Sequence, residues 1–196
     1  MSGVRRRPGT DVRRAPAAPP ERFWGWHRLQ PDWAEQLVAT ARLGPGDLVL
    51  DLGAGDGALT APLAATGARV LAVELHPYRL ARLRERFTDD PRVQVLDLDL
   101  LDLRLPGRRF HVVANPPWSL AKPLIRTLTV PGSALVSAHL VLQRGLVADV
   151  GRRGVAGPGR RTRFRTVYAA SVPRRAFRPS PPAPAAVLQI TARRGH

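Results

Sequence analysis

The sequence contains no cysteine, a single lysine, and no apolar run close to the ~20 residues that a membrane-spanning helix requires. The lack of cysteine excludes a disulfide framework and a thiolate metal site. The five histidines show no paired metal-ligand spacing, so no metal site is expected. Because no apolar segment follows the charged N-terminus, a secretory signal is not expected either, and we predict a cytoplasmic location.

Acidic residues are also scarce, since 15 of them face 31 basic residues and the net charge is +16. A charge of this size indicates a polyanionic partner, and nucleic acid is the first candidate. A high-GC codon bias toward arginine, alanine, glycine and proline is the alternative source of the charge. Nearly all basic residues are arginine, which suits bidentate phosphate contacts and stacking on bases.

The 196 residues are enough for one domain with its own core. Residues 1–22 are rich in arginine, proline, alanine and glycine, so we predict a disordered basic tail. This tail is either a solvated extension or an arm that contacts RNA. Residues 23–196 are predicted to form a single domain.

Strands and helices are predicted to alternate along this domain. Strands are expected at 48–52, 69–74, 93–96, 110–114, 133–142, 165–171 and 186–192. Helices are expected at 31–42, 58–65, 78–87, 120–127 and 143–150. The alternation predicts an α/β, Rossmann-like fold whose mainly parallel seven-stranded sheet has helices on both faces and a final antiparallel hairpin at its edge.

A glycine-rich turn follows the first predicted strand. Gly53, Gly55 and Gly57 allow a tight turn and a close approach of backbone to ligand, at the sheet edge where such folds bind ligands. The spacing is GxGxG, which differs from the GxGxxG of dinucleotide-binding proteins. Glu74 ends the next strand, where its carboxylate can accept hydrogen bonds from both hydroxyls of a ribose. A solvent-exposed strand end is the alternative for this residue.

Three carboxylates follow the strand at 93–96. Asp99 is placed to accept a hydrogen bond from the 6-amino group of an adenine, but Asp97 and Asp102 compete with it and spacing alone does not separate them. Together with the glycine turn, these carboxylates predict a site for a nucleoside cofactor.

The sequence Asn115-Pro116-Pro117-Trp118 follows the strand at 110–114. The side-chain oxygen of Asn115 and the carbonyl of Pro116 can hold an exocyclic amine and favour a pyramidal nitrogen with a free lone pair. The prolines stiffen the turn, and Trp118 offers a stacking face worth on the order of 1–3 kcal/mol. Combined with the glycine turn, this predicts methyl transfer from S-adenosylmethionine to an amino nitrogen. A surface turn with a packed tryptophan is the alternative.

The target base must leave its stack to reach such a pocket. Phe164 follows a Gly/Arg-rich stretch and is predicted to close over the other face of the base, with a place in the core of the next strand as the alternative. Arg160, Arg161 and Arg163 lie in that stretch and are expected to bind the substrate.

Three segments carry a family resemblance: DLGAGDGALTAPLAATGARVLAVELHP, VVANPPW and PRRAFRPSPPAPAAVLQI. They resemble the Erm-type 23S rRNA adenine-N6 methyltransferases, within the wider rRNA adenine dimethylase family. The likeness runs from Trp24 to the end, and WGWHRL and the short length are most similar to short mycobacterial and actinobacterial Erm proteins.

The resemblance implies a class I S-adenosylmethionine-dependent methyltransferase that modifies an adenine in the peptidyl-transferase region and confers macrolide, lincosamide and streptogramin B resistance. The implied partner is 23S rRNA, naked or in an assembling large subunit, and a monomer without metal or membrane contact is expected. Asn115, Pro116, Pro117 and Trp118 would form the catalytic turn, and Phe164 would stack on the base. The implied cofactor-binding residues are His27, Leu29, Gly53, Ala54, Gly55, Glu74, Leu75, Asp99, Leu100 and Asn115.

The chain departs from the family pattern at four places. GWHR replaces an N-terminal Gln-Asn-Phe-type motif, Trp118 replaces a tyrosine or phenylalanine, and Ala-Pro-Ala at 183–185 replaces Val-Asp-Ser. The sequence also ends where longer members carry a C-terminal helical domain. The basic tail and the arginine-rich segments would then hold the RNA, which predicts looser target choice.

Other functions stay open at this point. One is a different adenine-N6 methyltransferase acting on 16S rRNA or DNA, and a protein-amide methyltransferase is less favoured because of the basic charge. The other is a non-catalytic RNA-binding ribosome-assembly factor that retains the cofactor fold, which would bind the cofactor without turnover.

Overall fold

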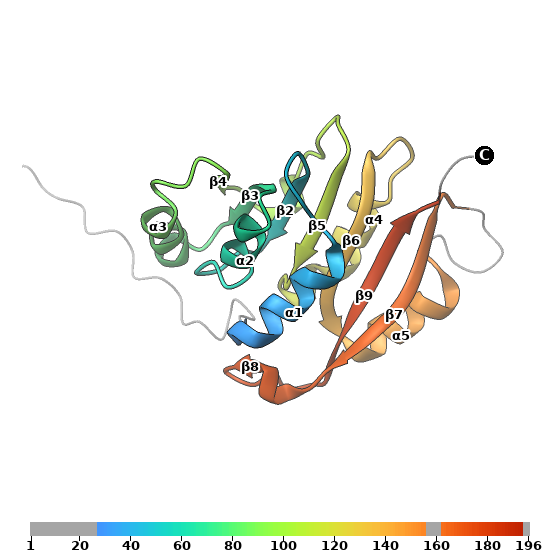
Figure 1. Cartoon of the computed structure of the whole chain (residues 1–196). Helices are drawn as coiled ribbons and strands as arrows, with labels where there is room; N and C mark the ends of the chain where they lie inside the picture. The colour runs from blue at the N-terminus through green and yellow to red at the C-terminus, as the bar shows by residue number, and fades with distance from the viewer. Residues whose placement is uncertain (1–26, 156–161, 194–196) are drawn as a thin grey trace, which may run out of the picture.

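A computed structural model describes residues 27–155 and 162–193, and the predicted tail at 1–22 lies outside them. The described chain is built on a seven-stranded sheet with the order β4-β3-β2-β5-β6-β9-β7 (Figure 1). The strands are β2 (Leu48–Leu52), β3 (Arg69–Glu74), β4 (Val93–Asp97), β5 (Phe110–Ala114), β6 (Leu135–Gln143), β7 (Phe164–Val172) and β9 (Ala185–Ala192).

The first five of these strands in the sheet order are parallel, and β9 is antiparallel to both of its neighbours, β6 and β7. All five residues of the central strand β2 are buried, as expected for a parallel strand that is covered on both faces. The prediction of a mainly parallel seven-stranded sheet with an antiparallel edge is therefore confirmed.

Helices cover both faces of the sheet (Figure 1). They are α1 (Pro31–Ala41), α2 (Thr60–Ala65), α3 (Pro77–Arg86), α4 (Ala121–Leu128) and α5 (Arg144–Arg153). Leu37 of α1 and Leu63 of α2 belong to a buried cluster with Val49 of β2, on one face. Leu124 of α4 and Val147 of α5 belong to a second cluster on the other face. The apolar runs of the strands are thus buried between two helical layers.

The sequence did not predict a second, two-stranded sheet. Strand β1 (Arg28–Leu29) pairs antiparallel with β8 (Phe177–Arg178), and the backbone N–H of Gln30 donates to the carbonyl of Ala176 at 2.9 Å. Strands of two residues are too short to show the alternation by which strands are recognised. This pairing ties the segment before α1 to the segment that follows β7.

No helix in the described ranges is long and apolar enough to cross a membrane. The same ranges contain no group of three or more histidine, aspartate or glutamate side chains arranged to hold a metal ion.

Candidate active site

The carboxyl ends of β2, β3, β4 and β5 meet at one edge of the sheet, because these strands are parallel. A cleft opens there. Six of the predicted cofactor residues line it: Gly53, Glu74, Leu75, Asp99, Leu100 and Asn115. A smaller hollow shares Gly53 and Asn115 with the cleft and adds Leu29, Ala54 and Asp51. The tertiary structure thus brings residues from four strand ends to one place.

The glycine turn is tied to the end of β3. The backbone N–H groups of Gly53 and Ala54 both donate to the carbonyl of Val73 at 2.9 Å. Gly53 has φ +77°, and a Cβ on it would lie 3.2 Å from Cδ of Pro117 and 3.4 Å from Cα of Pro116. The lack of a side chain at position 53 therefore lets the cofactor turn and the Asn-Pro-Pro turn pack directly against each other.

Gly57 has a different role from the one its motif suggests. A Cβ at this position would lie 3.1 Å from Cδ1 of Leu83, in α3, and 2.7 Å from Cε2 of Phe87, which directly follows α3. Gly57 therefore allows close packing against α3, and it lines neither the cleft nor the hollow.

Glu74 is buried, and its carboxylate already accepts three backbone hydrogen bonds. Oε2 accepts from Gly55 N–H at 2.8 Å, and Oε1 accepts from the N–H groups of Leu75 (3.0 Å) and His76 (2.7 Å). A guanidinium nitrogen of Arg79 lies 3.6 Å from Oε1. These bonds fix the orientation of the carboxylate at the end of β3, where we propose that it accepts from the ribose of the cofactor.

Asp99 is the one of the three candidate carboxylates that lines the cleft. Its Oδ1 accepts from Leu101 N–H at 2.9 Å and caps a short 3₁₀ turn, Leu100–Asp102, which leaves Oδ2 for a ligand. Asp97 lies 3.9 Å from Arg84 at a surface where both side chains are half exposed. The position of Asp99 fits an acceptor for an adenine amino group.

Asp51 lines the adjoining hollow and is a candidate site residue that the sequence did not predict. It is fully buried, and Oδ2 accepts from the Thr60 hydroxyl at 2.7 Å. Its other oxygen, Oδ1, has no hydrogen-bond partner within the described part of the chain. Burial raises the pKa of Asp51 to about 7. The signal for it in the sequence was a single carboxylate inside the otherwise apolar strand Leu48–Leu52.

The donor set fits S-adenosylmethionine on these observations. Asp51 lines the hollow beside the cleft, and we propose its unpartnered carboxylate as the partner of the ammonium group at the amino-acid end of the cofactor. Glu74 and Asp99 line the neighbouring cleft, and we propose that they bind the ribose and the adenine, respectively. An unpaired buried carboxylate oxygen is costly, so a cationic ligand group would relieve it.

We expect cofactor affinity to depend on the ionisation of Asp51. Below pH 7 the carboxyl is protonated, so binding of an ammonium should weaken by about tenfold per pH unit. S-adenosylhomocysteine carries the same ammonium group. Its dissociation constant should be measured by calorimetry from about pH 5.5 to about pH 8.5, a range that extends about 1.5 units to either side of the pKa of Asp51. Asp51→Asn should remove the dependence, and Asp32→Asn, an exposed control in α1, should retain it.

The stability of the free protein should change with pH in the opposite direction to the cofactor affinity. Because the pKa of Asp51 in the folded state lies above its ordinary value of 3.8, the free energy of unfolding should decrease as pH rises from there toward 7. A pH dependence of cofactor affinity that is equal in the wild type and Asp51→Asn would contradict the assignment.

Asn115 is held in one orientation by the chain before α1. Its Nδ2 donates to the backbone carbonyl of His27 at 2.6 Å, which fixes Oδ1 as the free acceptor of the amide. Trp118 begins a 3₁₀ turn, Trp118–Leu120, and its ring centroid lies 5.9 Å from that of His27 at an interplanar angle of 44°. His27 thus contacts both ends of the predicted catalytic turn.

The prediction for Phe164 is wrong. Phe164 is 2% exposed in the core and pairs with Ala192 at the far end of the sheet. Because β7 runs antiparallel to β9, and β9 antiparallel to β6, its first residue lies at the edge opposite Asn115. Phe164 cannot reach a base at the catalytic turn, and Arg163 lies at the same distant edge. The predicted Arg160 and Arg161 lie outside the described residues.

The aromatic residue from this part of the chain that does lie at the catalytic edge is Phe177, in β8. It pairs with Leu29, and the carbonyl of nearby Pro179 lies 3.2 Å from Nδ1 of His27. Phe177 is buried at 1% exposure. Its segment was visible in the sequence as FRP, but only the β1–β8 pairing places it next to Leu29, two residues after His27.

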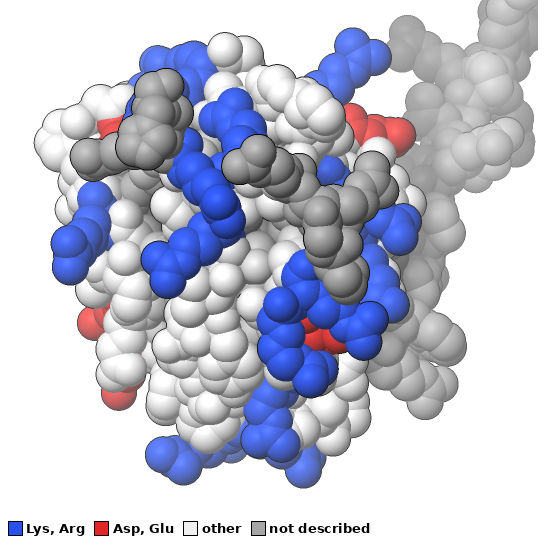
Figure 2. All heavy atoms as spheres, turned by 90° about the vertical axis from the view of Figure 1, so that its right-hand side faces the viewer, with Lys and Arg blue, Asp and Glu red and all other residues white. Residues whose placement is uncertain are grey.

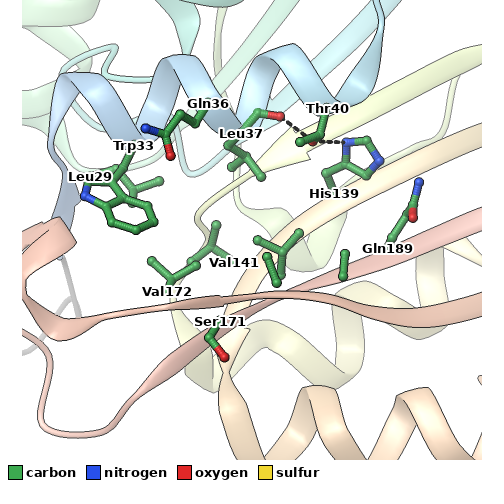
Figure 3. A pocket seen from close by; sticks show the side chains of 13 residues that line it. Leu29, Trp33, Gln36, Leu37, Thr40, His139, Val141, Ser171, Val172 and Gln189 are labelled. Carbon is green, nitrogen blue, oxygen red and sulfur yellow. Dashed lines mark hydrogen bonds between the residues drawn. The ribbon is translucent and has the colours of Figure 1, made fainter.

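A largely apolar groove lies apart from the cleft, between α1 and the face of β6, β7 and β9 (Figure 3). Of the predicted site residues it contains Leu29 alone. His139 lies in its wall, with Nδ1 3.3 Å from the Thr40 hydroxyl, and burial lowers the pKa of His139 to about 4. The groove has no charged group at neutral pH and no part of the cofactor geometry.

Residues 29–196 match the family model described as ribosomal RNA adenine dimethylase. The chain belongs to this family. It is 38% identical over 160 residues to the ribosomal RNA small subunit methyltransferase A of Thermosynechococcus vestitus, covering 74% of this chain and 59% of that protein. It is 32% identical over 189 residues to the protein of the same name from Synechococcus sp. (strain JA-3-3Ab), covering 89% and 68%. The chain therefore spans roughly three fifths to two thirds of these relatives.

Solved structures show the same fold. The 23S rRNA methyltransferase ErmE matches with a TM-score of 0.72 and 26% identity, over 85% of this chain and 70% of ErmE. A dimethyladenosine transferase from Plasmodium falciparum matches with a TM-score of 0.73 and 21% identity, over 85% and 64%. These matches confirm the class I methyltransferase fold, and membership of the dimethylase family confirms S-adenosylmethionine as the cofactor.

Proposed function

We propose that this protein transfers a methyl group from S-adenosylmethionine to N6 of an adenine in ribosomal RNA. The observation that carries the proposal is the direct packing of Gly53 against Pro116 and Pro117. It places the cofactor cleft and the amine-binding turn in contact, with Asn115 lining both the cleft and the adjoining hollow.

The chain's own residues would act on the acceptor amine. Asn115 Oδ1 and the Pro116 carbonyl accept its two N–H groups, which holds the nitrogen and favours the pyramidal form with a free lone pair. The bond from Asn115 to the His27 carbonyl keeps Oδ1 pointed at the amine. When bound, S-adenosylmethionine supplies an electrophilic methyl group and leaves as a neutral thioether. Most of the acceleration then comes from positioning and electrostatics.

Trp118 is proposed to stack on the extruded adenine. It is half-buried at the start of its 3₁₀ turn, and the tilted ring of His27 packs beside it. Its indole offers more stacking area than the tyrosine or phenylalanine expected at this position. After transfer the nitrogen releases a proton to water, since no general base is needed once the amine carries positive charge.

The substrate is proposed to be small-subunit rRNA. The two relatives described above are both named ribosomal RNA small subunit methyltransferase A, which favours the 16S alternative over the 23S target that the sequence segments suggested. A second candidate is 23S rRNA, with antibiotic resistance as its consequence, because ErmE shares 26% identity with this chain.

Transfer of labelled methyl from S-adenosylmethionine to protein-free 16S rRNA, 23S rRNA and duplex DNA tests the proposal, with positions mapped by reverse-transcriptase stops. Label on 16S rRNA adenine supports the first candidate, and label on a peptidyl-transferase adenine of 23S rRNA supports the second. Label on DNA alone, or cofactor binding without transfer to any nucleic acid, would contradict an rRNA methyltransferase.

A further inference from the structure

The two halves of the chain differ in net charge. Residues 1–102 contain 14 basic and 14 acidic residues, whereas residues 103–196 contain 17 basic residues and one acidic residue, Asp149. A codon bias toward arginine would act along the whole chain and would not remove acidic residues from one half. The asymmetry therefore points to a partner that contacts the part of the fold built by the second half.

That part is one side of the sheet. The first half of the chain supplies β4, β3 and β2, and the second half supplies β5, β6, β9 and β7 together with α4 and α5. The candidate cofactor residues up to Asp99 therefore come from the neutral half. The strands of the basic half extend from the middle of the sheet to its edge strand, β7. Figure 2 views this side of the molecule and shows basic side chains spread over it with few acidic ones.

Six exposed arginines mark the two ends of this side. Three follow β7 at the catalytic edge, and three lie at or beside its start, at the opposite edge of the sheet. The first three are Arg174, Arg175 and Arg178, and the second three are Arg163, Arg165 and Arg193. We define the second three as the distal arginines.

None of the six has a carboxylate within ion-pair distance in the described ranges. Asp149 pairs with Arg152 at 3.7 Å and Arg153 at 2.6 Å instead. The Arg163 guanidinium lies 5.2 Å from the centroid of the Phe164 ring, which orients it. Arg193 donates its backbone N–H to the carbonyl of Arg163 at 2.7 Å, so these two arginines are held side by side. Guanidinium groups without a carboxylate partner suit phosphate oxygens.

We propose that the substrate RNA lies along the β7 side, with its backbone bound at the catalytic edge and again at the distal arginines. This rests on the proposed function, and it adds a second phosphate-binding region that the catalytic site does not need. The nine residues of β7 span roughly 30 Å, about one helical turn of a nucleic-acid duplex. The substrate would then be a helical segment that extends about a full turn beyond the target adenine.

The test compares two triple variants that lose the same charge. One replaces the distal arginines: Arg163→Gln, Arg165→Gln and Arg193→Gln. The control replaces three exposed arginines of the neutral half: Arg42→Gln, Arg69→Gln and Arg82→Gln. Binding is measured with a short stem-loop and with a stem-loop extended by roughly 20 base pairs, about two helical turns. Because exposed charges are screened over about 8 Å at physiological salt, loss of charge in the neutral half should not act at a distance.

For the extended RNA we expect the distal variant to raise the dissociation constant at least about tenfold and to lower the slope of log affinity against log salt by two to three. The short stem-loop should bind both variants like the wild type, and the control should match the wild type for both RNAs. Equal losses in the two variants, or no loss in the distal variant, would overturn the proposal. Tighter binding to phosphatidylserine vesicles than to RNA, abolished in the distal variant, would also overturn it.

Binding is measured without turnover, so this result is separate from the methyl-transfer assay. If the wild type binds the extended RNA through the distal arginines but transfers no methyl group, the proposed function is contradicted and the proposed RNA-binding surface is retained. Thermal denaturation checks that both triple variants fold. If the distal triple variant does not fold, the single variant Arg193→Gln replaces it and should lower the slope of log affinity against log salt by about one.

Discussion

Replacing Asn115 by alanine should lower kcat for methyl transfer by about 1,000-fold, the upper end of what loss of one positioned polar group costs. The amine would lose its side-chain acceptor, while Pro116 would still offer a carbonyl. RNA affinity should stay within about threefold, because most of the affinity comes from phosphate contacts elsewhere. Single-turnover transfer of labelled methyl, with saturating RNA and cofactor, measures the chemical step directly.

Ser119→Ala is the matched control for this variant. Ser119 is exposed in the 3₁₀ turn Trp118–Leu120, which follows Asn115, and its hydroxyl makes no hydrogen bond in the described structure. Removal of this hydroxyl should therefore leave kcat unchanged. Asn115→Asp keeps an acceptor oxygen but places an anion against the His27 carbonyl, which Nδ2 now contacts at 2.6 Å. That variant should also fail. Full activity in Asn115→Asp would show that the amide's donor is not what positions the acceptor.

Replacing Gly53 by alanine should reduce kcat by about 100-fold, a loss typical of a displacement near 1 Å at the reacting groups. The new Cβ would sit 3.2 Å from Cδ of Pro117 and 3.4 Å from Cα of Pro116, and a stiff proline turn cannot give way as a flexible side chain can. The turn would therefore move away from the cofactor. Pre-steady-state transfer and the affinity for S-adenosylhomocysteine should be measured together.

Gly46→Ala separates backbone strain from displacement of the turn. Gly46 has φ +91°, similar to the +77° of Gly53, but a Cβ on it would meet nothing within 4 Å. Both variants should lower the free energy of unfolding by about 1–2 kcal/mol, the cost of an L-residue with positive φ. Only Gly53→Ala should also lower kcat, and Gly46→Ala should keep the wild-type value. Equal activity in the two variants would mean that contact between the turns is not needed for transfer.

Asn115→Ala and Gly53→Ala change the two turns that meet at the site. The cofactor turn and the amine-binding turn come from β2 and β5, which are neighbours in the sheet and parallel to each other. In such a pair the loops at the carboxyl ends lie next to each other, so a methyl donor and acceptor can meet without any movement of the core. The fold supplies this proximity, and Gly53 sets how close it is.

The sequence by itself determined the seven strands of the main sheet and the five helices, but not β1 and β8. It also determined those site residues that are neighbours in the chain. The strands Leu48–Leu52, Arg69–Glu74 and Phe110–Ala114 match their predicted limits, because buried parallel strands are apolar runs bounded by turn residues. The glycine turn and the Asn-Pro-Pro-Trp turn could be recognised because each function is contained within a few consecutive residues.

The tertiary structure alone decided contacts between segments far apart in the chain. The choice of Asp99 over Asp97, the anchoring of Asn115 on the His27 carbonyl and the raised pKa of Asp51 all depend on neighbours that arrive from other elements. The error over Phe164 has the same origin. The antiparallel hairpin of β7 and β9 was predicted, but the direction in which β9 joins β6 was not, and that direction determines which edge Phe164 reaches. The composition of a strand does not encode its direction.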